Sequence, residues 1–286
     1  MMDKIKSVGI VGAGTMGIGI AQVCALAGYG TFLFDISPGL VSQALSRIEK
    51  NMEEGVAKGK VAPEQKAEAM SRLVVVNKLD GLKADLIIEA IVEDLEVKQK
   101  LFGELERING GNAILATNTS SIPVTRIAAA LKGPSKCIGL HFFNPAHIMK
   151  LVEVISGAST SPGLVARMKE FSLSLGKVPV VAKDSPGFIV NRVARHYYVE
   201  ALQVLEEKVA DVEAIDLLLE SSGFKMGPFR LMDLIGVDTN LAVTTSMYNG
   251  FHQAPKFRPS RIQERKVEAG ELGRKAGKGF YDYKGK

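Results

Sequence analysis

The stretch Gly12-Ala13-Gly14-Thr15-Met16-Gly17 decides the fold. It follows the apolar run Ser7–Val11 and opens a helical run at residues 18–27, so a GxGxxG pattern lies between an expected strand and an expected helix. In that context the first glycine permits a tight turn, the second lets the backbone approach a pyrophosphate, and the third allows the helix to pack closely on the strand. The stretch therefore predicts a dinucleotide site, with the phosphates at the positive end of the helix.

Asp35 ends the second apolar run, residues 31–34, eighteen positions after Gly17. A ribose-binding carboxylate is expected about 20 residues beyond the glycines in a dinucleotide fold. A carboxylate there accepts hydrogen bonds from both ribose hydroxyls and repels a 2′-phosphate, so the sequence predicts NAD rather than NADP. The glycines alone leave FAD open. The alternative is that they form only a strand–helix turn and that Asp35 caps a helix.

Apolar runs alternate with helical patterns over about the first 185 residues. This alternation predicts an α/β fold of the Rossmann type, with a largely parallel, doubly wound sheet and helices on both faces. One insertion, residues 37–71, is almost wholly helical in composition and has Gly55, Gly59 and Pro63 near its middle, which predicts a helical hairpin. The expected strands are 7–11, 31–34, 73–76, 86–88, 113–116, 137–141, 151–155 and 178–182, and the expected crossover helices include 37–52, 97–108 and 162–175.

The composition changes after Asp184-Ser185-Pro186-Gly187, where a long helical pattern begins at about Phe188 and ends at Glu207. Further helices are expected at 212–220, 231–248 and 261–269. We therefore predict two domains, a Rossmann-type domain at 1–184 and an all-helical C-terminal domain at 185–286.

The composition is that of a folded globular protein, with 46% hydrophobic and 23% charged residues. The net charge is +5, but the basic residues are interspersed with acidic ones and form no arginine-rich arm. This pattern disfavours nucleic acid as a partner and favours anionic small ligands. No apolar run approaches the roughly 20 residues of a membrane helix, and no leader pattern opens the chain, so we expect a cytoplasmic protein without a membrane partner. Cys24 and Cys137 have no metal-ligand spacing, so we expect two buried thiols and no metal site.

A histidine and a glutamate stand out as acid–base candidates. His141 opens His141-Phe142-Phe143-Asn144-Pro145 just after an expected strand, and Glu153 lies twelve positions later among apolar residues. Adjacent strand ends can bring the two together, and a carboxylate behind an imidazole fixes its tautomer and stabilises its charged form. The alternatives are a histidine bonded to backbone and a strand acid facing solvent. An acid flanked by apolar residues on an interior strand should, however, be paired.

Taken together, these motifs resemble the 3-hydroxyacyl-CoA dehydrogenase family. The motifs that carry the resemblance occur in order over essentially the whole chain. Because the chain is compact, it is most similar within the family to the bacterial 3-hydroxybutyryl-CoA dehydrogenases. Besides the stretches quoted above, it rests on Asn118-Thr119-Ser120-Ser121, Lys150-Leu151-Val152-Glu153-Val154, Pro186-Gly187-Phe188-Ile189-Val190-Asn191-Arg192, Met226-Gly227-Pro228-Phe229 and Gly277-Lys278-Gly279-Phe280-Tyr281.

The resemblance implies a reversible, NAD-dependent oxidation of L-3-hydroxyacyl-CoA to 3-ketoacyl-CoA, with short chains such as 3-hydroxybutyryl-CoA. It implies that His141 is the general base, that Glu153 orients it, and that Ser120 and Asn191 bind the reacting oxygens of the substrate. Two alternatives stay open. Ser120 could cap a helix that begins near Pro123, and Asn191 could pair with loop backbone.

The resemblance also implies residues that bind the cofactor and CoA. It implies that the C-terminal domain contributes to the substrate cleft and that the protein is a homodimer formed through this domain. Asn51 and Lys58 on the helical hairpin would contact CoA, with Lys50 and Lys60 also at its bend, unless these lysines form only an exposed basic face. Lys98 could equally be a solvated helix lysine. Two other functions stay open, a crystallin-like protein without activity and a dehydrogenase of a free hydroxy or sugar acid. The implied cofactor contacts are Gly12, Gly14, Thr15, Met16, Gly17, Asp35, Glu93, Lys98 and Asn118.

Overall fold

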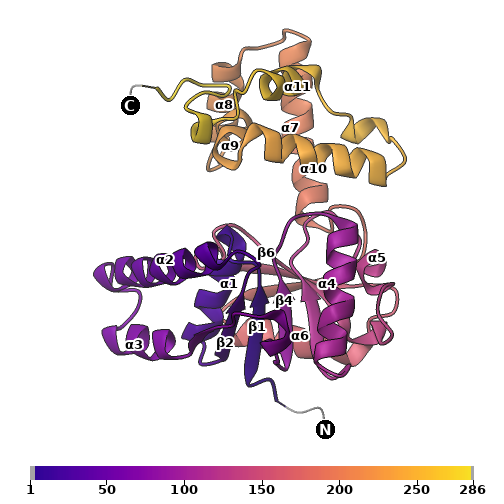
Figure 1. Ribbon diagram of the computed structural model, residues 1–286. Coiled ribbons are helices and arrows are strands. Elements are labelled where there is room, and N and C mark those ends of the chain that lie inside the picture. Colours follow the sequence, from indigo (N-terminus) through magenta and orange to yellow (C-terminus); the bar gives the residue numbers. More distant parts are fainter. Residues whose placement is uncertain (1–3, 285–286) are drawn as a thin grey trace. The chain divides into compact units, whose positions relative to one another are not determined.

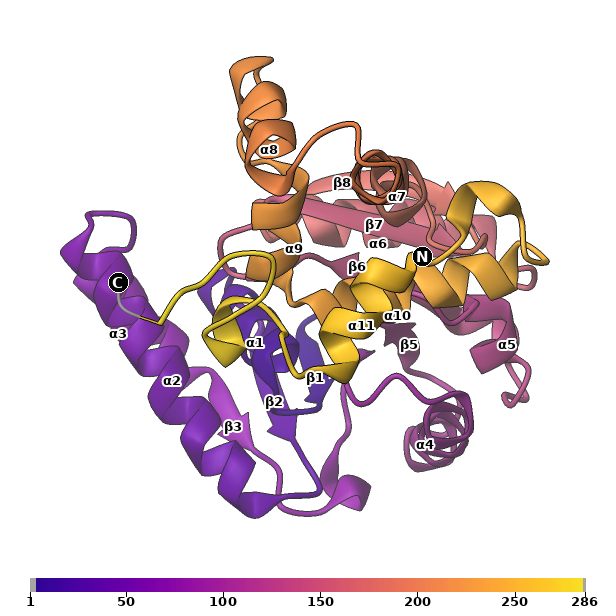
Figure 2. The same ribbon diagram turned by 90° about the horizontal axis from the view of Figure 1, so that it is seen from above.

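The computed structural model describes residues 4–284. The chain divides into two compact units, the first ending at Ser185 and the second beginning at Pro186. The first contains a sheet with helices and the second consists of helices and loops (Figures 1 and 2).

The first unit is built on one eight-stranded sheet with the order β3-β2-β1-β4-β5-β6-β7-β8. Strands β3 to β6 of this order run parallel, β7 is antiparallel to β6, and β8 is parallel to β7. Every expected strand is present with its ends within one residue. The strands are β1 (Ser7–Val11), β2 (Gly30–Phe34), β3 (Leu73–Val75), β4 (Leu86–Glu89), β5 (Ile114–Thr117), β6 (Cys137–Phe142), β7 (Leu151–Ser156) and β8 (Val178–Lys183).

Helices cover both faces of this sheet, which confirms the Rossmann-type prediction. The central strands are mostly apolar because they are buried on both sides, as in β4, where three apolar residues and Glu89 are all buried. Helices α1 and α6 share one apolar core with the hairpin α2–α3, whereas α4 and α5 pack at β5 and β6 outside that core. The helices are α1 (Thr15–Leu26), α2 (Pro38–Ala57), α3 (Pro63–Ser71), α4 (Leu95–Ile108), α5 (Val124–Ala128) and α6 (Pro162–Ser174), with short 3₁₀ turns η1 (Leu79–Gly81) and η2 (Pro134–Lys136).

The expected helical hairpin is α2 and α3, which lie side by side in Figure 1 and contact each other. Lys66 of α3 joins the two helices through an ion pair of 2.8 Å between its Nζ and Glu53 Oε1. One expectation about the hairpin is wrong. Lys50 lies inside α2 rather than at the bend, because α2 continues to Ala57.

The second unit is helical, as expected, but one of its helices is not continuous. The expected helix at 231–248 is wrong, because Gly236 adopts a φ of 106° and separates α9 from α10. An added Cβ there would lie 2.9 Å from Asp238 Oδ1, so the break depends on glycine. The helices are α7 (Val190–Glu206), α8 (Val212–Ser221), α9 (Pro228–Ile235), α10 (Val237–Gly250) and α11 (Arg261–Glu268), with 3₁₀ turns η3 (Pro255–Phe257) and η4 (Arg274–Ala276).

Two further findings concern the described residues 4–284. None of their helices combines the length and the apolarity that crossing a membrane requires. Cys24 and Cys137 are buried free thiols, as expected, and burial raises the pKa of Cys137 to about 12.

Candidate active site

The glycine stretch forms the turn between β1 and α1, and two of its glycines are required by close approach. Gly12 has a φ of 107°, and a Cβ there would lie 2.4 Å from Ala90 O. A Cβ on Gly17 would lie 1.8 Å from Gly12 O. Gly14, by contrast, is the N-cap of α1 without a side-chain cap, and a Cβ on it would meet nothing within 4 Å. The stretch thus offers backbone N–H groups beside open space, which suits a phosphate.

Asp35 lies directly beyond β2 and reaches back to this turn. Its Oδ2 accepts a hydrogen bond of 2.7 Å from Ala13 N, and its Oδ1 accepts one of 2.9 Å from Ser37 N. Because Ser37 is the N-cap of α2, the interpretation of Asp35 as the helix cap is wrong. A cavity of about 730 Å³ begins here and continues between apolar side chains that include Leu40 and Val97. A carboxylate at the mouth of an apolar cavity fits a ribose and a purine ring, so the residues present fit NAD.

Lys98 is not a solvated lysine, so that alternative is wrong. Its side chain is 1% exposed, and its Nζ bonds Glu89 Oε1 and lies 3.2 Å from Glu93 Oε2. Glu89 is fully buried, and its Oε2 accepts a hydrogen bond of 2.8 Å from Thr117 Oγ1. Sequence analysis missed Glu89, although an acid that ends the apolar run of β4 carries the same signal as Glu153.

Glu93 holds the turn that contains Ser120. Its Oε1 accepts hydrogen bonds from Ser120 N at 3.0 Å, from Ser121 N at 3.1 Å and from Thr119 Oγ1 at 2.6 Å. Burial opposes ionisation of Glu93, but the charge of Lys98 and the hydroxyl groups of Thr119 and Ser121, which both donate to Glu93 Oε1, hold its pKa below the usual range. The Glu89–Lys98–Glu93 group therefore fixes the backbone that presents Ser120.

Ser120 is not the cap of the following helix. The helix is α5, its N-cap is Pro123, and Val124 N and Thr125 N donate to the carboxylate of Asp184 at 3.1 and 2.7 Å. The capping alternative is therefore wrong. The capping carboxylate comes from the end of β8, which is why local sequence did not reveal it.

His141 and Glu153 lie directly opposite each other on the antiparallel strands β6 and β7. Their side chains are 2.8 Å apart between His141 Nδ1 and Glu153 Oε2, and the two residues are 6% and 0% exposed. The alternative that Glu153 faces solvent is therefore wrong. Asn118 Oδ1 accepts a hydrogen bond of 2.9 Å from Phe142 N, which ties the end of β5 to the strand that carries His141. With Nδ1 facing the carboxylate, proton exchange with a ligand falls to Nε2.

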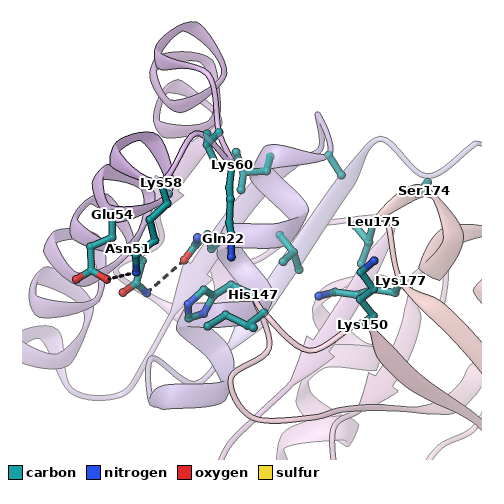
Figure 3. A pocket seen from close by; sticks show the side chains of 17 residues that line it. Gln22, Asn51, Glu54, Lys58, Lys60, His147, Lys150, Ser174, Leu175 and Lys177 are labelled. Carbon is teal, nitrogen blue, oxygen red and sulfur yellow. Dashed lines mark hydrogen bonds and ion pairs between the residues drawn. The ribbon is translucent and has the colours of Figure 1, made fainter.

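The hairpin residues line a second cavity in the first unit, of about 660 Å³ (Figure 3). Asn51 Nδ2 donates to Gln22 Oε1 at 3.3 Å, and Lys58 lies 3.7 Å from Glu54 Oε2. Lys60 also lines this cavity, whereas Lys50 does not. On the other side lie Lys150 and Lys177, which sequence analysis missed because only the fold brings them opposite the hairpin.

Asn191 belongs to the second unit, where it lies in the first turn of α7. Ser120, His141 and Glu153 belong to the first.

A dinucleotide-type fold that carries a buried imidazole–carboxylate pair is the arrangement of a nicotinamide-dependent dehydrogenase. Comparison with known families narrows this class. Residues 7–185 match the family described as "3-hydroxyacyl-CoA dehydrogenase, NAD binding domain", and residues 187–283 match "3-hydroxyacyl-CoA dehydrogenase, C-terminal domain". The chain belongs to the 3-hydroxyacyl-CoA dehydrogenase family, which confirms the resemblance and NAD as the cofactor.

Individual relatives cover the whole chain. A 3-hydroxyadipyl-CoA dehydrogenase of Escherichia coli is 47% identical over 99% of this chain, which spans 60% of that protein's length. A 3-hydroxybutyryl-CoA dehydrogenase of Bradyrhizobium diazoefficiens is 44% identical, with 100% of this chain and 98% of the relative covered. The crystal structure of (S)-3-hydroxybutyryl-CoA dehydrogenase from Ralstonia eutropha gives a TM-score of 0.94 at 41% identity, with 98% and 99% covered.

Proposed function

We propose that the protein interconverts L-3-hydroxyacyl-CoA and 3-ketoacyl-CoA with NAD, and that it prefers short chains such as 3-hydroxybutyryl-CoA and acetoacetyl-CoA. The observation that carries this proposal is the buried contact of 2.8 Å between His141 and Glu153 on neighbouring strands of a dinucleotide-type sheet. The names of the relatives from Bradyrhizobium and Ralstonia support the short chain.

In the oxidative direction, His141 Nε2 accepts the proton of the C3 hydroxyl, and in the reductive direction it returns that proton to the C3 oxygen. Glu153 holds the imidazole in the required tautomer and stabilises the positive charge that it gains. Bound NAD supplies the group that takes up the hydride. Ser120, whose turn is held by Glu93, and Asn191 hydrogen-bond the reacting oxygens of the substrate.

NAD binding is assigned to the turn after β1, including Thr15 and Met16, and to Asp35. Asn118 lies directly after β5, and Glu93 lies just before α4. Both are assigned to the same cofactor site. Lys98 is buried and commits its ammonium to two carboxylates. It therefore supports the cofactor site through Glu93 rather than by direct contact.

CoA is assigned to the cavity beside the hairpin, where Asn51 offers an amide and Lys58 and Lys60 offer positive charge to phosphate groups. A cytoplasmic location is part of the proposal, and the bacterial relatives support it. A homodimer is assigned to the second unit, because α8 exposes Leu217 and Leu218 at 64% and 67%.

A panel of CoA thioesters tests the substrate assignment. We expect kcat/KM with NADH to be highest for acetoacetyl-CoA and to fall toward C16, and free acetoacetate to react at least about 100-fold less efficiently, because it lacks the binding energy of CoA. The 47% identical relative makes 3-oxoadipyl-CoA the second candidate. If kcat/KM for free acetoacetate equalled that for acetoacetyl-CoA, the assignment of CoA thioesters as substrates would be wrong.

A further inference from the structure

Lys177 lies between α6 and β8 and is a buried lysine, at 6% exposure. Its Nζ donates hydrogen bonds to two backbone carbonyls, Ala146 O at 2.6 Å and Met149 O at 2.8 Å. Within residues 4–284, no carboxylate forms an ion pair with it. Burial lowers the pKa of Lys177, which reflects the cost of keeping an ammonium away from water. Because burying this ammonium costs free energy, Lys177 is expected to have a role beyond adding charge to the surface.

Both carbonyls belong to the connection between β6 and β7, residues 143–150. This connection joins the strand that carries His141 to the strand that carries Glu153. Lys177 bonds it once in its first half and once in its second half. Directly beyond Lys177, Val178 N also donates to Lys150 O at 2.8 Å, so the end of the connection is tied to the start of β8.

The opposite side of the connection rests on α1. A Cβ added to Gly19 would lie 2.9 Å from Ala146 Cβ, so this glycine lets the connection approach the helix closely. The connection is thus clamped between α1 and the ammonium of Lys177. Hydrogen bonds to a charged donor are stronger than neutral ones, so they can select one conformation of a loop that has several available.

The same connection forms one side of the cavity beside the hairpin. His147, Ile148 and Lys150 line it together with Lys177, opposite Asn51 and the hairpin lysines (Figure 3). Burial and, next, the charge of Lys177 lower the pKa of His147, which agrees with the closeness of the two groups. One loop therefore bears on both the cavity and the imidazole–carboxylate pair.

We propose that Lys177 is a positioning residue for the reaction: by holding Ala146 O and Met149 O, it fixes the β6–β7 connection so that the His141–Glu153 pair and the cavity side keep their shared geometry. The inference rests on the proposed roles of His141 and of the cavity. It differs from two simpler roles. A residue that only stabilises the fold changes the melting temperature alone, and a residue that only binds CoA phosphate changes the KM for the thioester alone.

Lys177→Met tests this, because methionine keeps most of the side-chain volume and removes the donors. We expect kcat with acetoacetyl-CoA to fall about 10-fold and the KM for the thioester to rise severalfold, since a small displacement of a reacting group is costly. The KM for NADH stays as in wild type, because the Asp35 cavity is built from other elements. The matched control is Lys183→Met, an exposed lysine at the other end of β8, which keeps wild-type kinetics.

Rescue of Lys177→Ala separates hydrogen bonding from charge. Propylammonium replaces the missing atoms and N–H donors and should restore part of kcat, whereas tetramethylammonium has the charge without the donors and should not. The proposal is overturned by a Lys177→Met kcat within twofold of wild type, by a change in the thioester KM alone, or by equal rescue with both cations. An inactive wild type would instead contradict the proposed function.

Discussion

His141 and Glu153 face each other where water is nearly excluded. An ionised carboxylate in such a place needs a partner, and the imidazole supplies one at 2.8 Å. In the mechanism that we propose, the two residues act together: the carboxylate sets the tautomer and the imidazole moves the proton. A change at either residue affects both.

His141→Gln keeps a side-chain donor for Glu153 but removes the group that accepts a proton. We expect kcat to fall by about 10²–10⁴-fold, the usual worth of a positioned acid–base group. NADH binding, measured by fluorescence titration, stays as in wild type. A kcat within a few-fold of wild type would mean that another group moves the proton.

Asp35→Ser removes the carboxylate that faces the cofactor cavity. We expect the ratio of kcat/KM for NADH over NADPH to fall at least about 10-fold, since a 2′-phosphate no longer meets a negative charge, and tenfold corresponds to about 1.4 kcal/mol. Steady-state kinetics with both cofactors give the ratio. An unchanged ratio, or a wild type that prefers NADPH, would contradict the assignment of Asp35.

The lysines of the hairpin α2–α3 differ in whether they line the cavity. Lys58 and Lys60 line the cavity, whereas Lys50 lies inside α2 and outside the cavity lining. The double variant Lys58→Ala/Lys60→Ala should raise the KM for acetoacetyl-CoA severalfold and leave kcat nearly unchanged, because in the proposed complex these side chains bind a part of the substrate that does not react. Lys50→Ala is the matched control. If the double variant had the KM of the wild type, CoA would not bind in this cavity.

The sequence revealed those elements whose signal is local. Apolar runs bounded by turn residues located all eight strands, and the glycine pattern located the cofactor turn. Helix α9 and helix α10 were expected as one helix because the helical pattern continues across Gly236, and only its φ of 106° separates them.

Residues whose role depends on a distant partner were not found in this way. Asp184 caps α5, Lys177 bonds the β6–β7 connection, and Glu89 pairs with Lys98. The contacts of Asp184 and Lys177 join positions that only the finished sheet brings together. Glu89 lies nine positions from Lys98, and its place at the end of an apolar strand is a signal that could have been used. The candidate pair of His141 and Glu153 was an exception, because an acid within an apolar strand requires a partner wherever that partner lies.

The homodimer that we propose would form through the apolar surface of α8. Leu217 and Leu218 are 64% and 67% exposed, and burying a leucine is worth about 2 kcal/mol. We expect a dimer in size-exclusion chromatography with light scattering, and a shift to monomer in Leu217→Glu/Leu218→Glu. Leu173→Glu on α6, which is also exposed, should leave the dimer intact. A monomeric wild type would contradict the assignment, and a variant that stays dimeric would exclude α8 from the interface.

We propose that the protein, with NAD at the glycine turn of its Rossmann-type sheet and His141 as its acid–base group, reduces a 3-ketoacyl-CoA. The most direct measurement is the fall in absorbance of NADH when purified full-length protein is mixed with acetoacetyl-CoA. We predict that NADH is oxidised until one equivalent per thioester has been consumed, and that L-3-hydroxybutyryl-CoA is the product. If NADH were oxidised no faster than without enzyme, the protein would not be a 3-ketoacyl-CoA reductase.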